Sequence, residues 1–257
     1  MKSELPESGS IADGPDSQSP TLAGEVFARL KADIISSRLP PGTKLRLHDL
    51  RQAYGVGFSP LREALSRLTE SRLVIAIGHR GFRVPDASAE DLMDVAMVRK
   101  QMEGFALRLA IRYGDDLWEA RAIDAGEKFA MLQRSGKNFP ENVWESRHRD
   151  FHYALIAACQ SPCLLHLFGV LTDQFDRYRR LSAKSRLPNA PRWLIHKEIL
   201  QATLARNADK AVKLLEDHIT EAARLMVVGL LGRADDRNVS SSVQPLAHRR
   251  RPSRAIR

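Results

Sequence analysis

One ten-residue stretch carries the signals of a helix N-terminus: Val56-Gly57-Phe58-Ser59-Pro60-Leu61-Arg62-Glu63-Ala64-Leu65. Ser59 followed by Pro60 is typical of such a start, because serine caps unpaired N–H groups and proline fits the first helical position. Leu61, Leu65 and Leu68 then recur on one face of the expected helix. The stretch therefore predicts an amphipathic helix that begins at Ser59-Pro60 and ends near Ser71.

Two helices are expected before this one, and a hairpin after it. Apolar spacing predicts the first from Thr21 to the turn at 39–42, and a second over about 47–54. Residues 73–77 and 82–84 have strand character, and a glycine-bounded turn separates them. Three small helices followed by a β-hairpin, within residues 21–85, predict a winged helix-turn-helix.

The basic residues are concentrated in this same segment. Residues 21–85 carry 11 Lys and Arg against 5 Asp and Glu, whereas residues 86–232 are almost neutral, with 21 against 20. A concentrated basic domain indicates a polyanionic partner such as nucleic acid. A solvated basic surface is the alternative interpretation of charge alone.

In a helix-turn-helix, the recognition helix places its first side chains on base edges in the major groove. Arg62 lies one turn into the predicted helix, where it can make a two-pronged contact to guanine. The phosphate backbone and the neighbouring minor groove are within reach of residues around the second helix and at the wing tip. The side chains expected to contact DNA on this basis are Arg46, Arg51, Ser59, Arg62, His79 and Arg80. Ordinary surface pairing of Arg62 with Glu63 is the alternative.

After Pro85 the strand pattern disappears. Ser88 and Asp91 form a capping box at the start of a long helix that is expected to reach Tyr113. Five more amphipathic runs follow, over about 115–135, 140–159, 163–183, 191–206 and 208–231. Residues 86–232 are therefore predicted to form an all-α six-helix bundle, so the whole chain should be mainly α.

The two ends of the chain lack helical periodicity. Residues 1–20 are rich in Ser, Gly, Pro and acids, and residues 233–257 carry seven Arg. Both are predicted as disordered tails. The longest apolar run, near Leu225–Leu231, is far shorter than the ~20 residues of a membrane span, and no signal peptide is recognisable. We therefore expect a cytoplasmic protein with no membrane partner.

Four histidines in the predicted bundle share an arrangement that suits a metal. His148 and His152 are four residues apart and therefore lie on one helix face, while His196 and His218 belong to the fifth and sixth predicted helices. Neutral imidazoles on neighbouring helices suit a borderline divalent ion such as Zn²⁺ or Ni²⁺. Ordinary core or surface histidines are the alternative. A metalloenzyme is a second alternative, although Arg149 follows His148 where a catalytic H-E-x-x-H helix has Glu.

The winged segment resembles the GntR family of bacterial transcription regulators. The family pattern is kept at Pro41-Gly42, Val56, Pro60, Arg62-Glu63-Ala64-Leu65, Leu73-Val74 and Arg80-Gly81. The chain departs from it at Gly57-Phe58, where the family usually has Ser-Arg. Phe58 is therefore expected to replace a polar operator contact with an apolar one, for example to a thymine methyl group. The resemblance implies a DNA-binding regulator, most simply a homodimeric repressor on a palindromic operator.

The helical segment resembles the FCD effector domain of the FadR-type branch of that family. This resemblance implies a divalent metal held by one Asp and three His, and it assigns the three His positions to His152, His196 and His218. His148 stands at the usual Asp position, so a four-His set is expected, which favours softer ions than Mn²⁺ or Mg²⁺. A metal-free sensor of acyl thioesters, also FadR-like, is an alternative.

The resemblance extends to the effector. The Arg-His-x-x-Phe-His form around His148 is most similar to the carbon-starvation-induced regulator subgroup, which senses glutarate. Arg99 and Arg177 match Arg positions of that subgroup and are the candidates to bind an effector carboxylate, since guanidinium groups bind carboxylates with two parallel hydrogen bonds. A surface ion pair is the alternative for each. The resemblance thus implies a small carboxylate effector bound beside the metal, such as the dicarboxylate glutarate.

Overall fold

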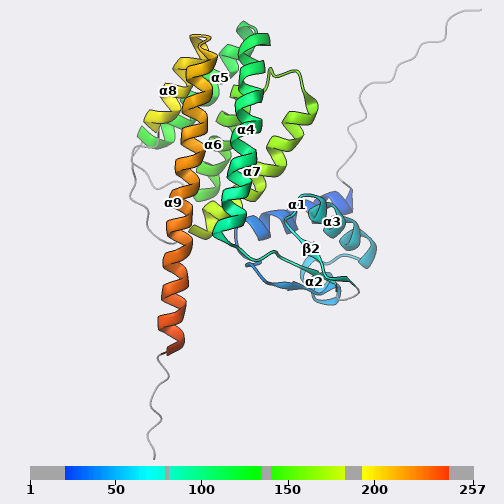
Figure 1. Cartoon of the computed structure of the whole chain (residues 1–257). Helices are drawn as coiled ribbons and strands as arrows, with labels where there is room; N and C mark the ends of the chain where they lie inside the picture. The colour runs from blue at the N-terminus through cyan, green and yellow to red at the C-terminus, as the bar shows by residue number, and fades with distance from the viewer. Residues whose placement is uncertain (1–20, 79–80, 135–139, 183–192, 243–257) are drawn as a thin grey trace, which may run out of the picture.

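The structure, a computed structural model, describes residues 21–78, 81–134, 140–182 and 193–242. A small domain of three helices and a short sheet lies at one end of a larger bundle of long helices (Figure 1). This arrangement confirms the predicted fold class, a winged helix-turn-helix followed by an all-α bundle.

The small domain contains the three predicted helices and a three-stranded antiparallel sheet of order β1-β3-β2. Its elements are α1 (Leu22–Ile35), β1 (Lys44–Leu45), α2 (Leu47–Tyr54), α3 (Phe58–Glu70), β2 (Ile75–Ala76) and β3 (Phe82–Arg83). Leu30 and Ile34 of α1 are buried against Leu61, Leu65 and Leu68 of α3. The apolar spacing of both helices is thus explained by a shared core. Strand β1 was not predicted, because two residues are too few to show a period.

The start of α3 differs from the prediction. Gly57 is the N-cap, so the helix begins at Phe58 and Ser59 is its second residue rather than its cap. The first N–H groups of any helix have no partner within the helix, so Pro60 is tolerated at the third position as well as at the first. The turn before α3 depends on Gly55, which ends α2 in the left-handed region at φ +69°.

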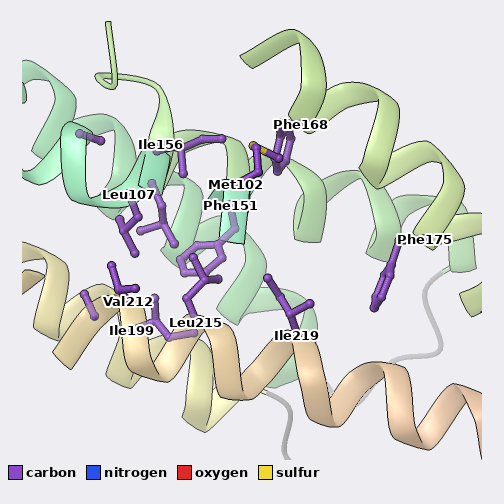
Figure 2. Packing of buried hydrophobic residues seen from close by; sticks show 14 of the residues in the cluster. Met102, Leu107, Phe151, Ile156, Phe168, Phe175, Ile199, Val212, Leu215 and Ile219 are labelled. Atoms are coloured by element: carbon purple, nitrogen blue, oxygen red, sulfur yellow. The ribbon is translucent and has the colours of Figure 1, made fainter. Parts of the chain in front are cut away.

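The larger domain contains all six predicted helices. They are α4 (Ala89–Tyr113), α5 (Asp116–Arg134), α6 (Glu141–Ile156), α7 (Pro162–Ser182), α8 (Trp193–Leu204) and α9 (Ala208–Ser242). The capping box is present, since Ser88 Oγ accepts a hydrogen bond from the Asp91 N–H at 3.0 Å. Buried side chains of α4, α6, α7, α8 and α9 belong to one core, and Figure 2 shows Phe151 of α6 facing Leu215 of α9.

Helix α9 is longer than predicted. It continues to Ser242, into the segment that was expected to be a tail, and Figure 1 shows its C-terminal part extending beyond the bundle. Neither Pro nor Gly occurs between Arg233 and Ser242, so no residue there breaks the helix. The predicted tail 1–20 and residues 243–257, the remainder of the predicted tail 233–257, lie outside the described residues. No helix in the described part of the chain is both long enough and apolar enough to cross a membrane.

Helix α7 connects the two domains through polar contacts. Gln174 Nε2 donates a hydrogen bond to the Ser71 carbonyl at 3.0 Å, just after α3. Asp173 Oδ2, also on α7, accepts a hydrogen bond from Lys31 Nζ of α1 at 2.9 Å. The winged domain is therefore attached to the bundle by directed hydrogen bonds, whose geometry depends on the position of α7.

Candidate DNA-binding surface and metal centre

The exposed face of α3 carries the residues predicted to read bases. Phe58, Ser59 and Arg62 are exposed, whereas Leu61 and Leu65 of the same helix are fully buried. Arg62 follows Phe58 by four residues, so both side chains lie on one helix face. The helix therefore presents an aromatic ring and a guanidinium group together at its N-terminal end.

Two further predicted DNA contacts lie beside this face. Arg46 and Arg51 are both exposed, and the guanidinium carbon of Arg51 lies 5.2 Å from the centre of the Phe58 ring. Phe58 is 45% exposed, which is unusual for a phenylalanine in a folded domain. The structure thus brings Arg51 and Phe58 together at the helix-turn-helix. His79 and Arg80, the predicted wing tip, lie outside the described residues.

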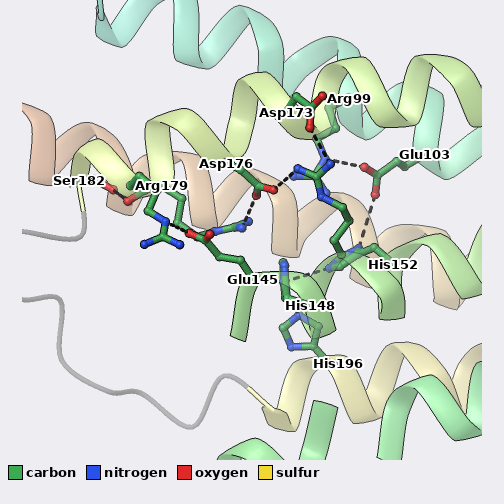
Figure 3. A network of polar contacts seen from close by, with 12 residues as sticks. Arg99, Glu103, Glu145, His148, His152, Asp173, Asp176, Arg179, Ser182 and His196 are labelled. Atoms are coloured by element: carbon green, nitrogen blue, oxygen red, sulfur yellow. Dashed lines mark hydrogen bonds and ion pairs between the residues drawn. The ribbon is translucent and has the colours of Figure 1, made fainter. Parts of the chain in front are cut away.

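The four predicted metal ligands converge inside the bundle. One ring nitrogen from each histidine lies within 4.8 Å of the other three. His148 Nε2 is 3.1 Å from His196 Nε2 and 3.2 Å from His152 Nε2 (Figure 3). The His218 ring, from α9, lies 4.4 Å from the His196 ring between centroids. Three helices that are distant in sequence therefore direct their imidazoles at one point.

Burial makes these imidazoles good ligands. It lowers the pKa of His148 well below its usual range, and the nearby Arg179 charge lowers it further. Burial does the same for His218, with His196 contributing. Both rings are therefore neutral at pH 7 and keep a nitrogen lone pair available. Four imidazole nitrogen donors with this spacing, three on buried side chains and His218 on a partly buried one, fit a divalent ion such as Zn²⁺ or Ni²⁺.

A carboxylate lies behind one of the ligands. Glu103 Oε2 of α4 is 3.5 Å from His152 Nδ1, and Glu103 Oε1 accepts a hydrogen bond from Arg99 Nε at 2.5 Å. All three side chains are buried. Burial lowers the pKa of His152, while the Glu103 charge opposes that shift. The Glu103 carboxylate therefore faces the Nδ1 side of the His152 ring, away from the other histidines.

The two predicted effector residues lie in different places. Arg99 is beside the histidine cluster, but it is paired with Glu103 and its guanidinium packs 4.6 Å from the Phe175 ring centre. Arg177 donates through Nη2 to the carbonyl oxygens of Pro85 and Asp86, and it lines a cavity of about 360 Å³ at the junction of the two domains. Its hydrogen bonds thus go to the interdomain linker and not to the histidine cluster.

One basic residue near the cluster was missed by the sequence analysis. Arg179 of α7 donates to Asp176, and its guanidinium carbon lies 5.5 Å from the centre of the Trp144 ring. Trp144 in turn stacks on His148, with 4.7 Å between ring centroids and 14° between planes. Nothing in the local sequence separates Arg179 from the other arginines of α7, so its place beside the cluster emerges only from the packing of α6 on α7.

Comparison with known proteins identifies the two domains. The family described as bacterial regulatory proteins, gntR family, matches residues 22–84, and the FCD domain matches residues 94–221. Over 205 residues the chain is 38% identical to the uncharacterized HTH-type transcriptional regulator BphR of Paraburkholderia xenovorans, covering 77% of this chain and 82% of that protein. The chain belongs to the GntR family. It is also 34% identical over 197 residues to the HTH-type transcriptional repressor GlaR of Escherichia coli, covering 74% and 89%.

Solved structures of GntR-type regulators share the fold. The E. coli protein McbR/YncC matches with a TM-score of 0.68 at 20% identity, over 80% of this chain and 97% of that one. A GntR transcriptional regulator from Rhodococcus sp. RHA1 matches with a TM-score of 0.62 at 24% identity, over 80% and 97%. This GntR-family chain is therefore a DNA-binding transcription regulator with an FCD domain, and the metalloenzyme alternative is not supported.

Proposed function

We propose that this GntR-family chain is a homodimeric repressor whose FCD domain holds one divalent metal ion and binds a small carboxylate effector beside it. The observation that carries the proposal is the convergence of four ring nitrogens, from His148, His152, His196 and His218, within 4.8 Å. Ordinary surface histidines would point to solvent instead of converging inside the bundle. The metal-free alternative, an acyl-thioester sensor, gives no reason for the cluster.

The ligand set favours Zn²⁺ or Ni²⁺. Four neutral imidazoles bring no negative charge, whereas Mg²⁺ and Mn²⁺ prefer carboxylate oxygens. His148, which stands at the position of the usual FCD aspartate, is what removes the carboxylate from this set. When bound, the ion supplies a double positive charge in a buried site, and Glu103 orients one of its ligands.

The effector is proposed to be a dicarboxylate such as glutarate. A carboxylate in a buried helical site needs charge compensation, because its desolvation is costly. The metal provides positive charge at one end. Arg179 is the best-placed cation for the other end, since it packs on Trp144, and that ring stacks on His148. The resemblance to the carbon-starvation-induced regulator subgroup supports the same effector class.

The remaining parts of the proposal follow from how such a regulator acts. A winged helix reads only a few base pairs, so two copies on a palindrome are needed for a specific site. Homodimerisation is therefore part of the proposal, as is location in the cytoplasm, where bacterial operators are found. Effector binding is proposed to weaken operator binding, which is the simplest mode of action for a repressor.

The experiment is an operator titration with zinc-loaded protein, on a duplex selected from random sequences. Glutarate and other C4–C6 dicarboxylates should weaken binding by about 5–150-fold, the usual range of allosteric coupling. Butyrate, which has one carboxylate, should weaken operator binding less than glutarate does. Arg179→Gln should abolish the glutarate response, whereas Arg147→Gln, an exposed arginine on α6, should keep it. A wild-type protein that ignores every dicarboxylate would rule out this effector class.

A further inference from the structure

One buried carboxylate joins the DNA-binding domain to the helix that carries two of the metal ligands. Asp173 of α7 pairs through Oδ2 with Lys31 Nζ of α1 at 2.9 Å. Through Oδ1 it pairs with Arg149 Nη1 of α6 at 2.6 Å. Arg149 directly follows His148 in the chain. Each oxygen of Asp173 therefore binds a cation from a different domain.

These two contacts of Asp173 differ from an ordinary surface salt bridge in their burial and in the number of their partners. The Asp173 side chain is only 8% exposed, and its two partners are each 31% exposed. Arg149 is held on its other arm by Asp176, with Nη2 to Oδ2 at 2.6 Å. Exposed pairs contribute little because water screens them and their side chains move, but a buried carboxylate with two fixed partners is sensitive to small displacements.

The bundle end of this network reaches the histidine cluster. Asp176 accepts hydrogen bonds from Arg179 (Figure 3) and from Arg149. Arg179 also packs on the Trp144 ring, which stacks on His148. An anion that binds beside the histidines attracts these two guanidinium groups and competes with Asp176 for them. Any such change alters the position of Arg149 relative to Asp173.

The other end of the network reaches the recognition helix. Lys31 lies on α1, whose apolar face shares a buried core with α3. Its Nζ is 5.6 Å from the centre of the Phe27 ring, and Arg67 of α3 packs on the same ring at 4.2 Å. The Phe27 ring, partly buried against that core, thus lies in contact with both Lys31 and Arg67, and it gives Lys31 a direct contact route to α3.

We infer that Asp173 is a positioning residue that couples the histidine cluster to the winged helix, by holding Lys31 and Arg149 at the same time. The inference rests on the proposed function, because it needs a ligand at the cluster. It assigns to Lys31 a role that is separate from direct DNA contact. Loss of the Lys31–Asp173 pair should leave the effector site and the DNA-binding surface intact, but effector binding should no longer change operator affinity.

The test uses full-length zinc-loaded protein with glutarate as the probe. Glutarate affinity is measured by calorimetry without DNA, and operator affinity by fluorescence anisotropy with and without glutarate. Lys31→Met should keep glutarate affinity within about twofold of wild type, while the glutarate-induced change in operator affinity falls from the usual 5–150-fold to less than about twofold. Lys31→Arg, which keeps the charge, should restore most of the response.

The matched control is Arg38→Met. Arg38 also belongs to the winged domain, and it pairs with Asp33 of α1 at 2.7 Å, with its side chain 77% exposed. This variant removes one positive charge from the same domain without touching α7, so it should respond to glutarate like wild type. Unfolding temperatures of all variants are compared, so that a loss of folding is not mistaken for a loss of coupling.

Two results would overturn the inference, and they are distinguishable. If Lys31→Met binds glutarate and still changes operator affinity as wild type does, Asp173 is not the coupling residue although the effector site stands. If calorimetry shows that wild type binds no glutarate, the proposed effector fails, and the inference that depends on it fails too.

Discussion

One ring nitrogen of His152 faces the carboxylate of Glu103, and its other ring nitrogen faces the remaining histidines of the cluster. Its Nδ1 lies 3.5 Å from Glu103 Oε2, and its Nε2 lies 3.2 Å from His148 Nε2. A carboxylate behind a metal-binding imidazole fixes the ring and increases its basicity. Glu103 is fully buried, so its charge acts on His152 with little screening by water.

Glu103→Gln should therefore weaken Zn²⁺ binding by about 10–100-fold, because the amide keeps the size of the side chain but removes the charge. Competition with a chromophoric chelator measures this affinity. Glu198→Gln, on the exposed side of α8, is the matched control and should bind zinc like wild type. Equal zinc affinities for both variants would contradict the role given to Glu103.

Metal removal should lower the stability of the protein. Anything that binds only the native state adds RT ln(1 + [L]/Kd) to the free energy of unfolding, so a chelator should lower the unfolding temperature. His218→Ala should lose the metal and this chelator effect. His166→Ala, an exposed histidine on α7, should retain both. Elemental analysis that finds no stoichiometric metal in zinc-supplied wild type would eliminate the site.

Arg99→Ala should reduce the free energy of unfolding by about 3–5 kcal/mol, because it leaves the buried Glu103 carboxylate without its partner. Urea titration measures the change. Arg108→Ala breaks an exposed pair with Asp209 and should cost less than about 1 kcal/mol. If the two variants are equally stable, the Arg99–Glu103 pair is not important for the fold. A loss of effector response in Arg99→Ala must therefore be interpreted together with its stability.

Arg62→Ala should cost about 1–3 kcal/mol on the selected operator and relax its sequence preference, because Arg62 is exposed one turn into α3. Arg46→Ala should weaken binding to all sequences alike, as expected for a phosphate contact. Anisotropy titrations with the operator and with a scrambled duplex separate the two effects. Normal operator binding by Arg62→Ala would show that α3 is not placed in the groove as predicted.

The sequence by itself determined the helices and their buried faces. Apolar residues at helical spacing need only the chain's own periodicity, so α3 and the long α4 with its Ser88 cap could be predicted directly. The same holds for His148 and His152, whose four-residue spacing fixes a shared face. Features that depend on only one or two residues were harder to predict from the sequence. The start of α3 was misplaced because Pro60 suits several positions of a first turn.

Only the tertiary structure decided which faces meet. Glu103 reaches His152 because α4 packs beside α6, and Asp173 joins Lys31 to Arg149 across more than a hundred residues of sequence. Arg177 was expected near the effector, but its hydrogen bonds go to the interdomain linker. Periodicity specifies which side of a helix is buried, but not which neighbour covers it. That choice depends on the packing of all the helices together, which no local stretch of sequence contains.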